Sequence, residues 1–154
     1  MDTIQLQAAQ GVAKVPRLYD LRAMDIATFI SSIFAGAFLI SRNFAALGDD
    51  DAARRTLVLG FLGLLPLAFL LILVPSSPKY DDLTRLAFQL GQAGIIHFAA
   101  VKVQGEALSK HRESGGLFYS RWRAAGISLL LLVLVLPILL GMLFFAARML
   151  HRAI

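Results

Sequence analysis

The strongest constraint on this chain is a run of 24 residues without a charge, from Ala124 to Ala147. A helix of that length is about 36 Å long and can cross a hydrocarbon core of about 30 Å. Basic residues stand at both ends of the run, with Arg121 and Arg123 before it and Arg148 and Arg152 after it. A soluble domain of this size does not need such a segment, so we expect the chain to be embedded in a lipid bilayer.

The composition supports this expectation. Of the 154 residues, 58% are hydrophobic and 16% are charged, whereas an ordinary soluble domain carries about 25% charged residues. The net charge of +5 suits a membrane protein, since Lys and Arg flank spans and face anionic headgroups. The basic residues are dispersed and lack the interleaved aromatic residues of a nucleic-acid platform. We therefore expect the lipid bilayer, and not nucleic acid, as a partner.

The sequence contains no cysteine. This excludes disulfides, thiol redox chemistry, cysteine lipidation and thiolate metal sites. The first 24 residues mix charged and polar residues and lack the apolar core of a signal peptide. We therefore expect targeting to depend on the first membrane span.

Four largely uncharged segments predict an all-α integral membrane bundle with four transmembrane helices. They follow a polar lead-in over residues 1–25 that ends in a short interfacial segment. Asp25 is the expected N-cap of the first span, and Pro66 is expected to kink the second. The acidic run from Asp49 to Asp51 is expected to stabilise a helix dipole and not to bind a metal, because it lacks EF-hand spacing. The expected spans are about 26–47, 56–75, 83–103 and 124–147.

Small residues recur at a spacing of four in two of these segments. Ser32 and Gly36 form such a pair in the first segment, and Ala87 and Gly91 form one in the third. This pattern lets helix backbones approach closely. The four residues are therefore predicted to be helix-packing positions.

The third segment is the most polar of the four. Arg85, Gln89 and Gln92 are spaced by four and three residues and so share one helical stripe. We expect a span whose polar residues face partner helices; the alternative is an interfacial helix, which leaves three spans. The orientation stays open, because the two sides of a four-span bundle would hold seven and eight basic residues.

His97 is the one ionisable residue expected near the middle of the membrane, with no Asp or Glu between the interfaces. Together with Gln89 and Gln92 it forms a candidate polar intramembrane site, in which we expect His97 to be buried. Its alternative roles are a proton relay and a structural hydrogen bond to a neighbouring helix. Haem ligation by two histidines is not expected, because His111 and His151 fall in a loop and a tail.

A second group of residues is predicted to anchor the chain at the membrane surface. Arg42 can extend its guanidinium from the first span to the interface. Tyr119 and Trp122 precede the last span, where amphipathic rings prefer the headgroup level, and Arg123 follows them directly.

No set of catalytic residues is visible. The sequence shows no Ser-His-Asp set, no phosphate-binding glycine loop and no paired carboxylate. We therefore expect no enzymatic activity, no cofactor and no metal. The expected lack of an intramembrane carboxylate also argues against a small proton-coupled exporter.

The first predicted span and the approach to the last one carry a further pattern of short motifs. These are Thr28-Phe29, Ala35-Gly36, Asn43-Phe44, Leu47-Gly48, Gly115-Gly116 and Trp122. In these motifs the chain resembles a family of small bacterial integral membrane proteins with four helices. The resemblance implies a four-helix fold in a bacterial membrane, and it implies no activity.

These observations favour a non-enzymatic accessory or assembly subunit that binds another membrane protein, or a second copy of itself, through its small-residue faces. One alternative is an immunity protein that neutralises a membrane-active toxin. The other is a small channel or transporter lined by Gln89, Gln92 and His97. The expected location is the bacterial inner membrane.

Overall fold

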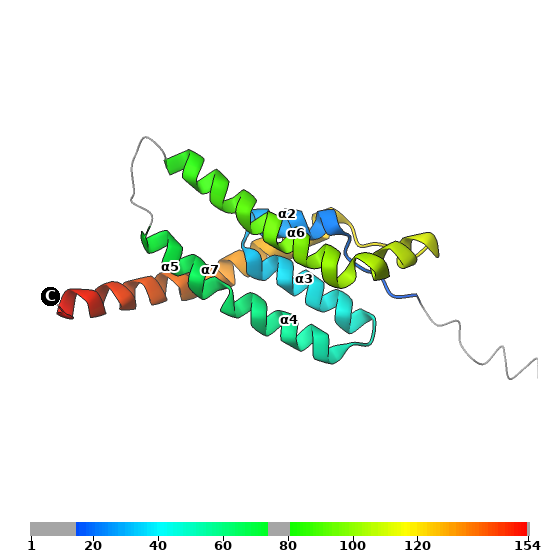
Figure 1. Cartoon of the computed structure of the whole chain (residues 1–154), viewed down its shortest axis with the longest axis horizontal. Coiled ribbons are helices and arrows are strands. Elements are labelled where there is room, and N and C mark those ends of the chain that lie inside the picture. Colours follow the sequence, from blue (N-terminus) through cyan, green and yellow to red (C-terminus); the bar gives the residue numbers. More distant parts are fainter. Residues whose placement is uncertain (1–14, 74–80, 154) are drawn as a thin grey trace, which may run out of the picture.

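The computed structural model describes residues 15–73 and 81–153, and this part of the chain has an all-α fold (Figure 1). Residues 1–14 of the predicted lead-in and residues 74–75 of the second predicted span lie outside the described residues. The helices are α2 (Leu21–Ile30), α3 (Ile33–Ala46), α4 (Asp50–Leu62), α5 (Leu64–Leu73), α6 (Asp81–Glu113) and α7 (Arg121–Ala153).

α2 and α3 form an antiparallel hairpin in place of the continuous helix predicted over residues 26–47. α2 ends at Ile30, the chain reverses over Ser31 and Ser32, and α3 returns beside α2 (Figure 1). At the open end of the hairpin, the Tyr19 N–H donates to Asn43 Oδ1 at 2.8 Å. The two arms are about 15 and 21 Å long at ~1.5 Å per residue. Neither arm by itself is long enough to cross a bilayer.

Two features define where the hairpin begins and turns. Asp20 is the N-cap of α2, because its Oδ1 accepts a hydrogen bond from the Ala23 N–H at 2.7 Å. The prediction of Asp25 as a helix N-cap is therefore wrong. At the turn, the Ile33 N–H has no partner within the first turn of α3 and donates instead to Gln92 Oε1 of α6 at 3.0 Å.

The hairpin is the centre of the fold. α2 lies against α6 and α7, and α3 packs against α4, α6 and α7. Gly36 allows the closest approach, because a Cβ at this position would overlap the Thr28 side chain of α2 and the Ile96 side chain of α6. Small side chains dominate the hairpin part of the core, among them Ala23, Ala27, Ala35 and Ala37.

α4 runs back along α3 and leads into α5. The Ser41 hydroxyl donates to the Ala53 carbonyl at 2.8 Å, and Gly60 lies against Ala37. The second predicted span is interrupted at Gly63, three residues before the expected kink at Pro66. Pro66 thus falls in the first turn of α5, where its missing N–H leaves no helical hydrogen bond unmade.

α6 and α7 each contain 33 residues. Among the described helices, these two are long and apolar enough, by length and composition, to cross a membrane, so the four predicted spans are not confirmed. α6 also continues to Glu113, ten residues beyond the predicted end at residue 103. Its buried face toward the hairpin follows a spacing of four, with Gln92, Ile96, Ala100, Gln104 and Leu108.

Candidate functional site

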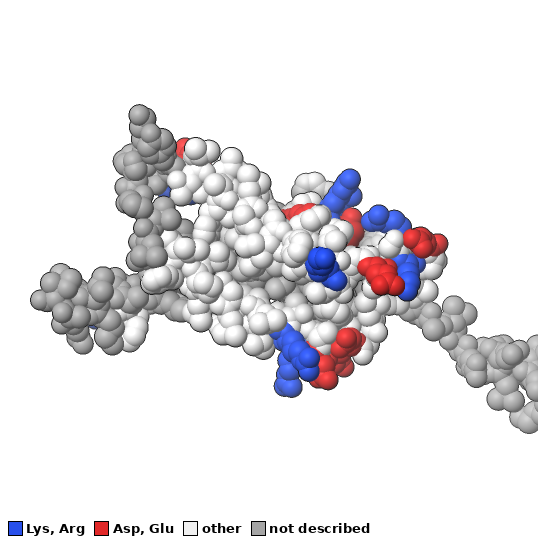
Figure 2. Space-filling view, viewed as in Figure 1, with Lys and Arg blue, Asp and Glu red and all other residues white. Residues whose placement is uncertain are grey.

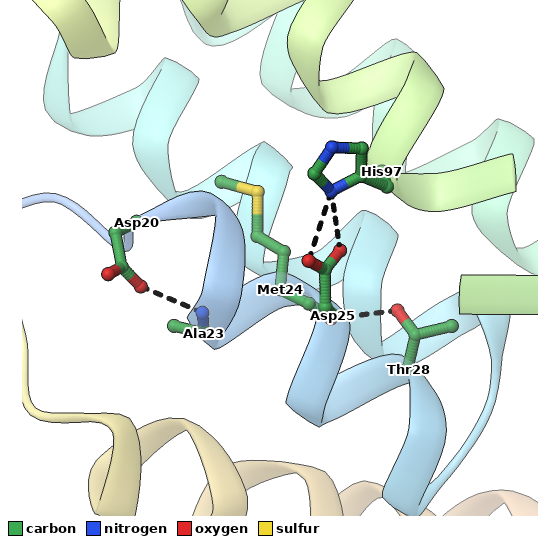
Figure 3. A network of polar contacts seen from close by, with 6 residues as sticks. All are labelled: Asp20, Ala23, Met24, Asp25, Thr28 and His97. Atoms are coloured by element: carbon green, nitrogen blue, oxygen red, sulfur yellow. Dashed lines mark hydrogen bonds and ion pairs between the residues drawn. The ribbon is translucent and has the colours of Figure 1, made fainter. Parts of the chain in front are cut away.

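The candidate site is an acid–imidazole pair that joins α2 to α6. His97 Nδ1 lies 3.0 Å from Asp25 Oδ2 and 3.2 Å from Asp25 Oδ1. Figure 3 shows the His97 ring extending from α6 toward the carboxylate on α2. The His97 side chain is 51% exposed and the Asp25 side chain is 32% exposed. The expectation that His97 is buried is therefore wrong.

The helices place both side chains at the edge of the packed interface. His97 follows Ile96, which is buried against Gly36, so the next residue along α6 falls outside the buried stripe. Asp25 follows Met24, which is also fully buried. Because α2 begins at Leu21 and not at Ile26, Asp25 lies inside the helix and not at its cap.

The predicted polar set of Gln89, Gln92 and His97 is brought together only in part. Gln92 is buried, accepts from the Ile33 N–H and donates through Nε2 to Gln89 Oε1 at 3.3 Å. Gln92 thus pairs a free N–H group at the start of α3 and Gln89 hydrogen-bonds Gln92, whereas His97 faces Asp25. His97 also lines a cavity of about 430 Å³ with Arg22, Arg112 and Arg121.

The predicted packing residues fall in two different environments. Ser32 and Gly36 are buried in the hairpin. The Ser32 hydroxyl, like that of Ser31, has no hydrogen-bond partner among the described residues. Ala87 and Gly91 lie on an exposed part of α6, and a Cβ built on Gly91 would meet no described atom within 4 Å.

The predicted anchors gather at the open end of the hairpin, which we call the hairpin base. The Tyr119 ring lies 4.7 Å from the Tyr19 ring, and the Arg123 guanidinium lies 4.2 Å above Tyr119. Trp122 is 87% exposed. Arg42 is exposed near the end of α3, and its charge acts on the phenol of Tyr19.

A buried amide cluster at the hairpin base was not predicted from the sequence. Asn43 Nδ2 donates to the Tyr19 carbonyl at 2.8 Å and to Gln104 Oε1 at 3.2 Å, and Gln104 Nε2 donates to the Ile40 carbonyl at 2.8 Å. Both side chains are 1% exposed. One available signal was Asn43 itself, a polar amide at the end of an apolar run.

The pair can exchange a proton or hydrogen-bond an approaching polar group. Asp25 is a carboxylate acceptor, and the imidazole of His97 keeps a second ring nitrogen for another partner. Within residues 15–73 and 81–153, no three His, Asp or Glu side chains lie close enough together to hold a metal ion. The pair alone therefore supplies at most two protein ligands to a metal.

The chain matches no protein-family model, no curated protein and no solved structure. The resemblance to small bacterial four-helix membrane proteins thus stays a prediction.

Proposed function

We propose that this chain is an integral membrane protein in which α6, α7 and the α4–α5 pair cross the bilayer around a re-entrant hairpin. The length and apolar character of α6 and α7 support this. α4 and α5 together cover residues 50–73, a path of about 36 Å. Large apolar side chains are exposed along these helices, for example Leu59, Phe69, Phe98, Leu134 and Phe144. Lipid is the solvent that suits such a surface.

In this arrangement the hairpin enters from one side, turns near the middle of the membrane and leaves on the same side. The turn is level with Gln92 and Gly63. Gln92 lies near the centre of the uncharged part of α6, which runs from Leu86 to Val101. The hairpin base is level with the charged ends of the surrounding helices.

The re-entrant hairpin changes the distribution of basic residues between the two sides. Figure 2 shows most of the Lys and Arg side chains at the end of the molecule that holds the hairpin base. Among the described residues, three basic residues, Arg85, Arg148 and Arg152, belong to the parts of α6 and α7 toward the other end. Ten belong to the base: Arg17, Arg22, Arg42, Arg54, Arg55, Lys102, Lys110, Arg112, Arg121 and Arg123. The charge rule then favours the cytoplasmic side for the base.

The function best supported is that of a non-enzymatic accessory subunit that binds another membrane protein at the Asp25–His97 pair. The carrying observation is that this pair is half-exposed beside the exposed apolar residues Phe29 and Val101. Phe29 is four residues after Asp25, and Val101 is four residues after His97, so the four side chains form one docking face. Asp25 lies about 7 Å along α2 from the cap at Asp20. A charged side chain costs about 3 kcal/mol at the centre of the bilayer and less toward the interface, so a protein surface that hydrogen-bonds the pair would be favoured over lipid.

The test is photo-crosslinking of the full chain in its native membrane. A benzophenone amino acid at Val101, on the docking face, is compared with one at Leu134, on an exposed part of α7. We expect a protein adduct from position 101, reduced in the Asp25→Asn/His97→Leu double variant, and no protein adduct from position 134. Lipid adducts alone at both positions would overturn the proposal. The adduct's mass distinguishes a second copy from another protein, and its identity distinguishes an assembly partner from a toxin.

Transport is the second candidate function, and the hairpin turn favours it. Broken helices near the membrane midplane form substrate and ion sites in transporters. Here the start of α3, the buried Ser32 hydroxyl and the Gln92 amide meet at such a break. Ion or solute flux through vesicles containing the purified chain tests this function. Flux that disappears in Gln92→Leu would favour transport, and vesicles as tight as protein-free ones would exclude it for the solutes tested.

A further inference from the structure

A second cavity, with a lining distinct from that of the His97 cavity, lies at the hairpin base. It has a volume of about 890 Å³ and lies between the segment before α2 and the turn that joins α6 to α7. Arg17 lines it from the first segment, Tyr119 lines it from the turn, and Arg123 lines it from the first helical turn of α7. Two stretches separated by about a hundred residues in sequence thus build one binding surface.

Backbone hydrogen bonds fix these two walls relative to each other. The Leu18 N–H donates to the Leu117 carbonyl at 3.3 Å, and the Tyr119 N–H donates to the Leu18 carbonyl at 2.8 Å. These bonds make an isolated parallel β-bridge between Leu18 and Phe118. The contact of Arg123 with the Tyr119 ring, at 4.2 Å, holds one guanidinium in place. Contacts within the fold therefore hold the two walls of the cavity relative to each other.

The chemistry of the walls suits a phosphate with an apolar neighbour. Two guanidinium groups, on Arg17 and Arg123, line the cavity, and none of its described lining residues is acidic. A guanidinium binds phosphate oxygens through paired hydrogen bonds. Val15 and Leu117 add exposed apolar side chains to the same walls. The cavity of His97 differs, because it contains Asp20, whose carboxylate lies 3.7 Å from Arg121.

We propose that this cavity binds the phosphate of an anionic phospholipid from the leaflet at the hairpin base. Trp122 is directly before Arg123 and is exposed, and tryptophan prefers the headgroup level of a membrane. Arg17 and Arg123 would contact the phosphate, while Val15 and Leu117 would cover the glycerol and the first acyl carbons. The inference depends on the proposed membrane location, and it does not depend on the docking face or on a protein partner.

The test is lipid binding by the full chain in a neutral detergent, measured as adducts retained in native mass spectrometry. The probes are short-chain phosphatidylglycerol, phosphatidylcholine of the same chain length, and inorganic phosphate. We expect phosphatidylglycerol to be retained preferentially. Its affinity should fall about fivefold for each guanidinium removed, in Arg17→Gln and in Arg123→Gln. Arg22→Gln is the matched control, because it removes an exposed arginine that lines the cavity of His97. This variant should leave the affinity for phosphatidylglycerol unchanged.

Each other outcome overturns the lipid site. Equal retention of the two lipids would show that the cavity does not select the anionic headgroup. Phosphate that displaces the lipid at equal concentration would indicate a site for a free anion. Unchanged affinity in the double variant Arg17→Gln/Arg123→Gln would place the lipid elsewhere. Arg123→Lys keeps the charge but loses the paired hydrogen bonds, so its affinity should lie between those of wild type and Arg123→Gln, and an affinity as low as that of Arg123→Gln would count against a role for the charge. Failure here leaves the docking face untouched, because crosslinking at Val101 tests that face separately.

Discussion

At the scale of single residues, side-chain amides of this protein bind backbone groups that helices leave unpaired. Asn43 accepts from the Tyr19 N–H and donates to the Tyr19 carbonyl, as a neighbouring β-strand would. Gln104 joins the same cluster, and Gln92 performs the corresponding role at the hairpin turn. Because all three side chains are buried, no water replaces their bonds at low cost.

The first prediction concerns Asn43. Asn43→Leu should lower the free energy of unfolding in detergent by about 3 kcal/mol or more, because it leaves both backbone groups of Tyr19 and the Oε1 of Gln104 without their bonds to Asn43. Gln89→Leu is the control; it removes one long hydrogen bond of 3.3 Å and should cost about 1 kcal/mol or less. Unfolding followed by helical circular dichroism measures both. Equal effects of the two substitutions would contradict the role given to Asn43.

The second prediction concerns Tyr19, which precedes the helices. Burial raises the pKa of its phenol above the ordinary value, and the charge of Arg123 acts in the opposite direction. The folded state therefore holds this proton to a higher pH than the unfolded state does. The resulting stability is complete below pH ~10 and is lost as the pH rises through the folded pKa. The difference in unfolding free energy between wild type and Tyr19→Phe should therefore shrink between about pH 9 and the folded pKa. A difference that stays constant over this range would contradict the burial argument.

Residue patterns in the sequence predicted some of these roles and missed others. The stripe of Gln89 and Gln92 was expected to face neighbouring helices, and Gln92 does so. Asp25 was assigned to a helix cap because it precedes the uncharged run, yet Asp20 caps the helix. Both acids precede apolar residues, and only the contact with α6 determines that Asp25 lies beside His97. The expectation that no Asp or Glu lies between the membrane interfaces depended on placing Asp25 at the N-cap of the first span.

At the scale of elements, the hairpin is the main feature that was not predicted from the sequence. Residues 26–41 contain no charge, and such a run is also what a transmembrane span requires. The reversal at Ser31 and Ser32 depends on partners far along the chain, since Gln92 binds Ile33 and Asn43 binds Tyr19. Hydrophobic periodicity reports local preference and contains no information on such long-range bonds. The C-terminal part of α6 was missed for a different reason: its charges indicated a loop, but Glu106 and Lys110 pair at 2.7 Å along the helix.

The third prediction tests how closely α3 packs against α2 and α6. Gly36→Ala should destabilise the protein by about 1–3 kcal/mol, because the added methyl group overlaps Thr28 and Ile96. Gly91→Ala adds the same methyl group where no described atom lies within 4 Å, and it should stabilise α6 by about 0.5–1 kcal/mol. Thermal melts of the two variants in one detergent provide the comparison. A shift of the melting temperature in the same direction for both variants would contradict the packing of the hairpin against α6.

At the scale of the whole molecule, the order of the layers is unusual for a protein with an aqueous surface. Small and polar residues of α2 and α3 form the centre, and the large apolar residues of α4, α6 and α7 are on the outside. The composition predicts lipid as the solvent of the chain. It could not indicate which predicted span is enclosed by the others, because enclosure depends on how the helices pack.

The fourth prediction concerns membrane topology. With a re-entrant hairpin, Arg17 and Asp50 lie on the same side of the membrane and Arg148 lies on the other. Single cysteines at these positions can be labelled without background, because the chain contains none. We expect Arg17→Cys and Asp50→Cys to react with a membrane-impermeant reagent from the cytoplasmic face, and Arg148→Cys from the opposite face. Labelling of positions 17 and 50 from opposite faces would contradict the re-entrant hairpin and support a first span over residues 26–47.

The bonds at the two ends of the hairpin also impose an order on biosynthesis. The hairpin is translated first among the described helices, but its turn binds Gln92 and its base binds Gln104 and Tyr119. At about 5–20 residues per second, the ribosome needs several seconds more to deliver these partners. With the proposed membrane location, the hairpin groups that are still unpaired during that interval would favour retention at the insertion machinery over release into lipid. We therefore expect integration of the N-terminal third to wait for the C-terminal half, and a chain truncated before α6 to be degraded faster than the full chain.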